Sequence, residues 1–440
     1  MEPAVTVERL ISQPISADGS FPLGLGALKR FIRCMWAVPF YQTLASRKVM
    51  PLMRTELNDL NPDRGRGKTK FPGANPFFHH CTFLQYYVAS KNGRDVGRVA
   101  AYIDGLYHEP GVAGTIGWVG LFEAVDDEEV ARALLEHATR DLEQHGVAKI
   151  IGPARFNANG EDGLLVDGFD QHPMVMEPYQ PPYYASYFEQ WGVKENDWYA
   201  FHITPKSAAP YLARIDALRQ HGRDPEQRLR QQGVVIRSVS MKDWDSEIAR
   251  IKAVYNTAWD SQVHPQFERF TDDEFAYLAA GLRMIAVEEL VFMVEDVDEP
   301  GRPAIGMAVT LPDLNEVIED VDRKHGRYVP STHVYGLGDI RRDLMVFVQL
   351  RRRVKRRAFR NIRVLILGTV RKRDGIDALL YEKTYRAGAA IGVEMASGSQ
   401  IADTNPEIYV PLARMGSADL TWRIYRHTAG TSNDVNLKPQ

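Results

Sequence analysis

The sequence predicts an α/β protein of two tandem domains, and three observations carry this prediction. Short apolar runs of strand length alternate with amphipathic stretches of helix length along the 440 residues. The order of these elements in the first half returns in the second half. A charged, Gln-rich segment at 205–232 separates the two halves. We therefore expect domains at 1–215 and 216–440, each with a mixed, mostly antiparallel sheet flanked by helices.

The first half contains a strand–helix–strand unit. The apolar run 115–122 predicts a buried strand. Asp126 and Glu129 have the spacing of a capping box at the start of a helix, and Gly146 stands where its C-terminal glycine belongs. A second short strand is expected at 149–152.

The second half repeats this unit. The run 364–368 predicts the first strand, apolar positions from Ile376 predict a helix closed by Gly388, and 390–394 predicts the next strand. Each half then has a helix, a glycine and a strand with the spacing Gly-x5-Trp-x2-aromatic: Gly192, Trp198 and Phe201, then Gly416, Trp422 and Tyr425. Agreement in order across four elements indicates an internal duplication.

A pair of strands precedes each unit, and a turn segment separates the two strands of each pair. These four strands are expected at 83–88, 97–102, 290–294 and 304–309. The second domain is expected to begin with a strand at 233–237 and a helix at 248–259.

Composition limits the class of protein. The chain is 44% hydrophobic and 25% charged, which is the balance of a globular protein. A net charge of −3 gives no general attraction to nucleic acid, so any anion site must be local. Two cysteines and the pair His79 and His80 make no recognisable metal set, so no metal is expected. Without a secretory signal at 1–10 or a run of ~18 apolar residues, the expected compartment is the cytoplasm.

The sharpest local motif lies at 370–377, between a predicted buried strand and a helix. Its backbone N–H groups face outward at the positive end of the helix dipole, and three basic side chains surround Gly375. This arrangement suits a pyrophosphate. A solvated basic turn is the structural alternative.

Here the chain resembles the GNAT superfamily of acyl-CoA N-acyltransferases. The phosphate loop of that superfamily follows the pattern Arg/Gln-x-x-Gly-x-Gly/Ala, and Lys372, Gly375 and Asp377 occupy the three patterned positions. Lys therefore replaces Arg, and Asp replaces the second small residue. The corresponding junction of the first half, 123–129, is acidic and has no glycine. The resemblance thus implies acyl-CoA as co-substrate, held by the second domain.

Further motifs look like a bacterial GNAT-like family that includes ceramide synthases. The motifs lie at 75–78, 97–98, 120–123, 152–153, 163–169, 182–184, 312–315 and 375–377. The resemblance covers roughly residues 70 to 427. It implies transfer of an acyl group from acyl-CoA to a small-molecule or lipid amine, with a long-chain acyl group and a sphingoid base as the specific case. A short-chain acyl or aminoacyl transferase and a non-catalytic acyl-CoA- or lipid-binding protein remain alternatives.

The resemblance also implies roles for residues near this motif. The proposed CoA-binding residues are Leu367, Gly368, Thr369, Val370, Arg371, Lys372, Arg373, Gly375 and Ile376. Glu394 is the first candidate for the general base, with an ion-paired carboxylate as the alternative. Asp403 is a candidate for orienting substrate, although this stretch also suits a helix N-cap. Leu412 and Phe188 stand where many GNAT enzymes have a Tyr acid, and Tyr409 could substitute or simply pack in the core.

Substrate contacts are expected in the first half. The insertion 153–182 has no counterpart of that length in the second half, and long loops of this kind are often functional. The candidate substrate residues are Arg98, Glu123, Asn157, Asn159, Glu177 and Tyr179. For Arg98 and Glu123, an ion-pair role and a position at the rim are equal alternatives.

Two segments suit peripheral contact with the inner face of a membrane. An apolar stripe within 25–36 has basic residues opposite, and 351–357 carries six basic residues. A core-facing helix explains the first segment better, and a solvated helix face explains the second. The sequence does not determine the oligomeric state.

Overall fold

The computed structural model describes residues 4–12, 21–43, 48–62, 75–156, 160–259, 264–325, 337–371 and 375–428. The elements of the first half are β1 (Thr6–Arg9), α1 (Leu25–Ala37), α3 (Met53–Asp59), β2 (Cys81–Lys91), β3 (Arg94–Asp104), β4 (Ile116–Ala124), α4 (Glu128–Gln144), β5 (Lys149–Gly152), β6 (Leu164–Asp167), α5 (Tyr184–Trp191) and β7 (Val193–Ile203). Two helices, α6 (Pro205–Gln220) and α7 (Pro225–Gln231), connect the halves.

The second half has the same succession of elements, except that it has two additional helices and, in its described residues, no strand corresponding to β6. They are β8 (Val234–Ser238), α8 (Trp244–Ala258), α9 (Asp272–Leu282), β9 (Val291–Asp296), β10 (Ala304–Pro312), α10 (Leu314–His325), α11 (Leu337–Arg356), β11 (Asn361–Thr369), α12 (Ile376–Ala390), β12 (Met395–Ala402), α13 (Pro406–Ala413) and β13 (Ser417–Thr428). The additional helices, α10 and α11, stand between β10 and β11.

The thirteen strands in the described ranges form one sheet, in the order β1-β2-β3-β4-β5-β13-β7-β12-β11-β10-β9-β8, with β6 paired to β13 off this path. The pairs β4–β5 and β11–β12 are parallel, and the other pairs are antiparallel. This is the predicted fold class, a mixed and mostly antiparallel sheet flanked by helices. Its order reads the same from both ends once the two halves are matched strand for strand.

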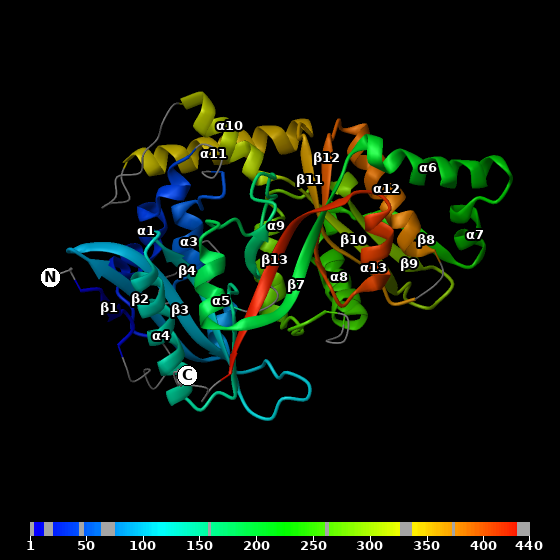
Figure 1. Ribbon diagram of the computed structural model, residues 1–440. Helices are drawn as coiled ribbons and strands as arrows, with labels where there is room; N and C mark the ends of the chain where they lie inside the picture. Colours follow the sequence, from blue (N-terminus) through cyan, green and yellow to red (C-terminus); the bar gives the residue numbers. More distant parts are fainter. Residues whose placement is uncertain are drawn as a thin grey trace, which may run out of the picture.

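The halves exchange their last strands. β7 ends the first half but pairs with β12 of the second, while β13 ends the second half and pairs with β5 of the first. The two exchanged strands lie side by side in the middle of the molecule (Figure 1). Trp198 and Trp422, the matched residues of the Gly-x5-Trp repeat, are directly opposite each other in this pair. The duplication therefore has a local two-fold axis at these two indoles.

Helices cover both faces of the sheet in each half. Alternation along β3 sends Ala100 and Tyr102 toward the core beneath α1, and Val99 and Ala101 toward the core beneath α4. The second half repeats this arrangement with α8 on one face and α12 on the other. The boundary predicted at residues 215 and 216 falls inside α6 and stays a prediction.

Three local predictions are wrong. The helix cap is Asp127 and not Asp126, because the Asp127 carboxylate accepts from the N–H groups of the next turn. Gly388 is buried within α12, which continues through Ala390 because alanine favours helix, and the left-handed residue is Gly392 at φ 83°. The strand expected at 390–394 begins at Met395 instead.

Candidate functional site

A gap opens between two parallel strands of the second half. β11 and β12 pair only where residues 361–364 meet 395–398. Beyond this point β12 keeps only β7 as a partner, on its other edge, and β11 keeps only β10, as far as Thr369. Backbone N–H and C=O groups along one edge of 365–369 therefore have no strand beside them. An extended ligand with amide groups can pair with such an edge.

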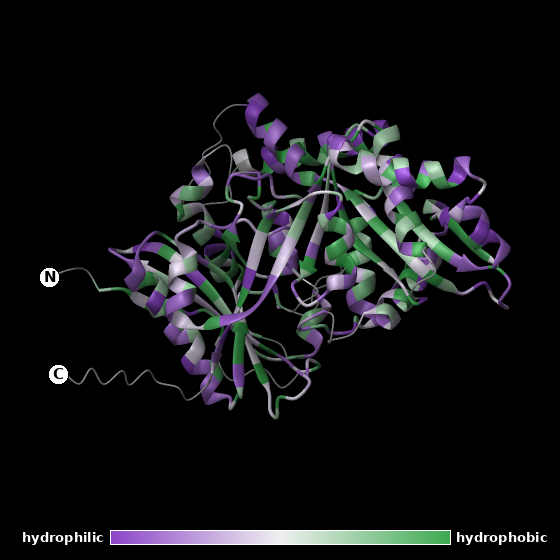
Figure 2. Ribbon diagram, turned by 45° about the vertical axis from the view of Figure 1, so that its right-hand side comes forward, coloured by the Kyte–Doolittle hydropathy of each residue, from purple (hydrophilic) through white to green (hydrophobic). Residues whose placement is uncertain are grey.

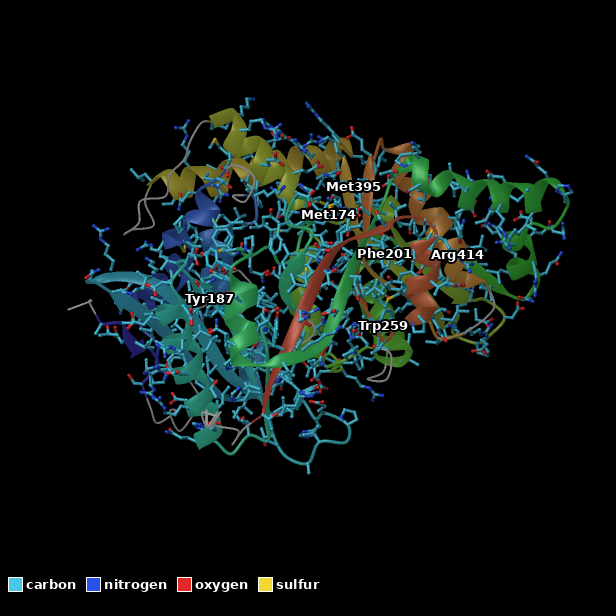
Figure 3. All side chains as sticks on the ribbon, viewed as in Figure 1. Met174, Tyr187, Phe201, Trp259, Met395 and Arg414 are labelled. Atoms are coloured by element: carbon cyan, nitrogen blue, oxygen red, sulfur yellow. The ribbon has the colours of Figure 1, made fainter. Side chains whose placement is uncertain are left out.

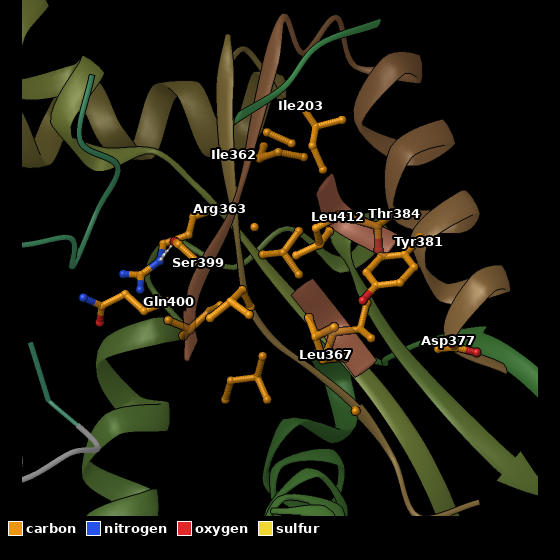
Figure 4. A pocket seen from close by; sticks show the side chains of 18 of the residues that line it. Ile203, Ile362, Arg363, Leu367, Asp377, Tyr381, Thr384, Ser399, Gln400 and Leu412 are labelled. Carbon is orange, nitrogen blue, oxygen red and sulfur yellow. Dashed lines mark hydrogen bonds between the residues drawn. The ribbon is translucent and has the colours of Figure 1, made fainter. Parts of the chain in front are cut away.

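A cavity of about 510 Å³ fills this gap (Figure 4). Its walls come from β11, β12, α6, α8, α12 and α13. The residues of β11 from 364 to 369 are only half-buried although the strand lies within the sheet, because the cavity lies against them. The volume is that of a small-molecule site, and the wall is mostly apolar.

Several polar atoms in the cavity wall have no hydrogen-bond partner among the described residues. The Tyr381 hydroxyl and the Thr384 Oγ1 on α12 are two of them. Figure 4 shows both side chains on one side of the cavity, opposite Arg363, Ser399 and Gln400. Unpaired buried polar groups cost free energy, and a ligand or water that pairs with these atoms would remove that cost.

The N-terminus of α12 lies beside the open end of β11. Gly375 takes the left-handed conformation at φ 76°, and no side chain of the described residues caps the helix, so its first N–H groups can meet an anion. Leu367, Gly368 and Thr369 line the cavity, whereas Ile376 is buried and Val370 donates its N–H to Ile305. Lys372 and Arg373 lie outside the described residues, so their predicted contacts stay predictions.

Arg371 is engaged elsewhere. Its guanidinium pairs with Asp296 on β9 and lies 3.5 Å from Glu299. A phosphate would have to compete with these two carboxylates for the guanidinium. The predicted role of Arg371 in binding CoA remains a prediction, and the described geometry favours the backbone of α12 as the anion contact.

The three predicted catalytic residues lie at different places. Glu394 lines the cavity, but it is exposed and precedes β12 instead of ending a strand. Asp403 accepts the N–H of Asp197 and lies 3.3 Å from the Lys194 ammonium, so it ties β12 to β7. Tyr409 packs edge-on against Tyr199 and Phe201. Only Glu394 of the three faces the cavity, and all three roles stay predictions.

The predicted substrate residues of the first half form a separate buried cluster. Glu123 accepts hydrogen bonds from Tyr41 and Tyr184, and the Arg98 guanidinium lies 4.0 Å away. Burial raises the pKa of Glu123 to about 7, against the lowering effects of Arg98 and the two hydroxyls. Arg98 itself lies against the Phe31 ring. This cluster does not line the cavity.

The insertion 153–182 connects the two halves at the cavity. Glu177 is buried, accepts from Ser397 on β12 at 2.7 Å and also bonds Ser399. Arg363 on β11 donates to Ser399 and to the Val175 carbonyl. The insertion thereby closes one wall of the cavity. Tyr179 instead donates to the Phe169 carbonyl, while Asn157 and Asn159 lie outside the described residues.

Sequence reasoning missed other residues of this wall. Gly160, Asp162 and Met176 of the insertion line the cavity, as do Trp198 of β7 and Trp259 at the end of α8. Trp259, labelled in Figure 3, lies so close to Gly368 that a Cβ there would come within 2.4 Å of its ring. The small residue in the strand, without a turn to explain it, was the available signal for this close approach.

The described part of the chain has neither a metal-ligand cluster nor a helix suited to cross a membrane. No group of three His, Cys, Asp or Glu side chains there is placed to hold a metal ion. None of the helices in the described ranges combines the length and apolar character that a bilayer crossing requires.

Two relatives resemble the chain in sequence, although no family model matches it. The chain is 33% identical over 254 residues to the bacterial ceramide synthase of Caulobacter vibrioides. The aligned region covers 58% of this chain and 62% of that protein. It is 32% identical over 252 residues to Protein YghO of Escherichia coli, covering 56% and 60%. The resemblance predicted from the motifs is confirmed, and it spans less than two thirds of each relative.

A solved structure of similar size is a tandem GNAT protein from the clavulanic acid biosynthesis pathway. It matches 97% of this chain and 100% of its own length, at 11% identity and a TM-score of 0.47. A TM-score of this size does not establish a common fold. The assignment of the site therefore depends on the geometry of β11, β12 and α12 and on the two sequence relatives.

Proposed function

We propose that the protein is an N-acyltransferase that moves an acyl group from acyl-CoA to an amine, with the thioester bound between β11 and β12. The observation that carries the proposal is the open edge of β11 leading to the uncapped N-terminus of α12. The edge suits the amides of a pantetheine arm, and the helix terminus suits its pyrophosphate. The sequence relatives add support, because one of them is named as a ceramide synthase.

The residues of the cavity fit this chemistry. An acyl thioester supplies a carbonyl that a neutral amine attacks, so an ammonium group must first lose a proton. Glu394 at the cavity rim takes this proton, directly or through a water. Free N–H groups on the edge of 365–369 stabilise the negative charge that develops on the carbonyl oxygen. Tyr409 packs away from the cavity, so solvent protonates the leaving thiolate.

The specific substrates we propose are a long-chain acyl group and an amine of the sphingoid type. Support comes from the name of the Caulobacter vibrioides relative and from the cavity wall. Aliphatic and aromatic side chains from α8, β11 and α13 dominate that wall. A polar short-chain donor would leave much of this apolar surface in contact with water.

Calorimetric titration with palmitoyl-CoA, acetyl-CoA and free CoA tests the proposal, together with release of free thiol when an amine is added. Ala258→Trp places bulk in the cavity, and Ala253→Trp on the same helix is exposed and serves as the matched control. We expect Ala258→Trp to weaken CoA binding by about tenfold or more, which is ~1.4 kcal/mol.

Each outcome has a consequence. Tight binding of palmitoyl-CoA alone, with thiol release, supports the long-chain assignment. Equal binding of the three ligands retains the transferase and removes the long-chain donor. Binding without thiol release for any amine supports a non-catalytic acyl-CoA-binding protein. Absence of binding, or equal effects of the two tryptophan variants, overturns the proposed cofactor site.

A further inference from the structure

Asp162 is a buried carboxyl group in the cavity wall for which the structure offers no partner. It is 4% exposed, and its Oδ1 has no hydrogen-bond partner in the described part of the chain. Its backbone is fixed by a bridge to Ala154 and by the Gln400 side chain, which donates to the Asp162 carbonyl at 2.8 Å. The backbone of Asp162 is thus held in place, while its Oδ1 has no partner among the described residues.

No cation among the described residues forms an ion pair with this carboxyl group. Burial, and then the like charge of Glu161, raise the pKa of Asp162 well above its usual range. Arg363 lines the same cavity, but it donates from Nε to Ser399 and from Nη1 to the Val175 carbonyl, and no hydrogen bond joins it to Asp162. His264, also in the wall, is neutral because burial lowers its pKa to about 4. A charged carboxylate here has no favourable interaction until a positive ligand arrives.

Asp162 and the N-terminus of α12 border different sides of the cavity. Its backbone contact Gln400 lies on the side of the cavity away from Asp377, which belongs to the first turn of α12 (Figure 4). The backbone of Asp162, bonded to Gln400, therefore lies across the cavity from the first turn of α12. Large apolar rings of Trp198, Tyr255 and Phe270 belong to the same wall. A cationic group joined to an apolar chain matches this combination.

We propose that Asp162 binds the acceptor as its ammonium ion, and that the acceptor is a primary amine carrying an apolar chain. This inference rests on the proposed transferase function, since it names the second substrate of the same cavity. The carboxylate and the ammonium form a charge-assisted hydrogen bond that replaces two unfavourable desolvated states. Asp162 positions the amine on the side of the cavity where Gln400 lies.

Direct binding of an amine tests the inference without any turnover. Octylammonium and the neutral 1-octanol are titrated into the full protein, with and without added CoA. We expect the wild-type protein to prefer octylammonium, and Asp162→Asn to lose that preference by about tenfold or more while binding of octanol persists. Asp162→Glu keeps the charge and is expected to restore part of the preference. Asp167→Asn removes an exposed carboxylate of the same insertion and is the control.

Thermal unfolding separates this role from a structural one. The raised pKa means that Asp162 opposes folding increasingly as the pH rises, so Asp162→Asn should be more stable than wild type in alkaline buffer. A structural carboxylate would give the opposite sign. Equal octylammonium affinity in wild type and Asp162→Asn, or no amine binding by wild type, overturns the inference. Neither result changes the outcome of the CoA titration, which tests the proposed transferase separately.

A different observation concerns the outer face of α11. The side chains of Ile340, Leu344, Phe347 and Val348 are exposed and recur at helical spacing. The opposite face is buried against α10, where Arg342 pairs with Asp322 and Arg353 with Glu316. Figure 1 shows α11 along the upper edge of the molecule beside α10, and Figure 2 shows the mixture of polar and apolar residues there.

Basic residues continue this exposed stripe. Arg341, Arg352, Lys355 and Arg356 are exposed and have no ion-pair partner among the described residues, while Arg351 stacks on the Phe347 ring. The apolar stripe and the cations therefore lie on one side of a single helix. Apolar burial combined with attraction to anionic headgroups is how interfacial helices bind a bilayer.

We infer that the outer face of α11 docks on an anionic lipid bilayer. Vesicles of phosphatidylcholine, with and without phosphatidylglycerol, are sedimented with the protein. We expect binding to the anionic vesicles alone, reduced about tenfold by Leu344→Glu with Phe347→Glu, and unaffected by Leu106→Glu at another exposed position. Binding that does not depend on α11 overturns the inference. A dimer that dissociates in the double variant also overturns it, in favour of a second copy of the chain.

Discussion

Each half has a gap between the same pair of strands, but the gap is open in one half and filled in the other. In the second half, the gap between β11 and β12 holds a cavity of about 510 Å³. In the first half, the chain following β5 enters the equivalent gap, where Ala154 donates its N–H to Val119 and Tyr102 bonds the Ala154 carbonyl. β4 is accordingly buried along almost its whole length, whereas most of β11 is only half-buried. One copy of the fold fills its gap with its own backbone, and the other leaves the gap for a ligand.

The difference extends to the residue at the closed end of each gap. Trp118 on β4 is paired across from Ile151, and its counterpart on β11 is Arg363, paired across from Ser397. The filled gap thus has an apolar base and the open gap a cationic one. Arg363 also holds the insertion of the first half against the second half. The open gap therefore depends on the other half for one wall.

Of the changes considered, removal of Arg363 should cause the largest loss of unfolding free energy, because Arg363 holds the first half against the open gap. Arg363→Ala leaves buried Glu177 without its nearest cation, at 3.8 Å, and leaves the Val175 carbonyl without its donor. Loss of one partner of a buried ion pair costs about 3–5 kcal/mol. Urea denaturation measures the change in unfolding free energy. Arg426→Ala breaks an exposed pair with Glu195 and should cost under about 1 kcal/mol. Similar losses in the two variants would contradict the argument.

The second effect concerns the filled gap. A Cβ on Gly120 would lie 1.7 Å from the Ala154 carbonyl oxygen, so Gly120→Ala must displace the backbone that fills the gap. We expect a loss of about 3 kcal/mol in unfolding free energy. Gly398→Ala in the second half meets only the Leu412 side chain at 3.2 Å and should cost far less. If the two variants melt at the same temperature, the gap in the first half is not filled as tightly as the structure has it.

The sequence predicted the repeat because strands, helices and glycines leave local patterns. It could not predict the exchange of β7 and β13, because each strand has the same pattern whichever half it pairs with. The filling of the first gap could not be predicted either. Gly120 and Ala154 have no distinctive sequence pattern, and only the folded structure shows that their backbones are in close contact. Glu394 lines the cavity, but it precedes β12, whereas the sequence predicted it at the end of a strand; its role as the base stays a prediction. Asp162 carried no signal, because its burial depends on both halves.

The third effect is a dependence of stability on pH in the first half. Burial raises the pKa of Glu123 to about 7, compared with 4.5 for the ordinary side chain. A raised carboxyl pKa stabilises the folded state below about pH 4.5, and this contribution is lost as the pH rises through 7. Its full size is at most about 3 kcal/mol. Glu123→Gln should flatten the unfolding free energy between these pH values.

Its control is Glu128→Gln, at the exposed start of α4 in the same half. That variant should keep the slope of the wild-type protein. An unchanged slope in Glu123→Gln would mean that Glu123 is hydrated in solution. The cluster of Tyr41, Tyr184 and Arg98 would then be more open than the structure describes.

The smallest effect sharpens the comparison most directly, because it concerns polar atoms in the open gap. The Tyr102 hydroxyl beside the filled gap donates to the Ala154 carbonyl, whereas Thr384 Oγ1 in the open gap has no described partner. Thr384→Val keeps the shape and removes an unpaired polar atom, so the free protein should gain up to about 1 kcal/mol. CoA binding should weaken if the hydroxyl pairs with the ligand. Differential scanning calorimetry and titration measure the two changes. A loss of stability in the valine variant would mean that Thr384 already has a partner and that the open gap is not prepared for a ligand at this position.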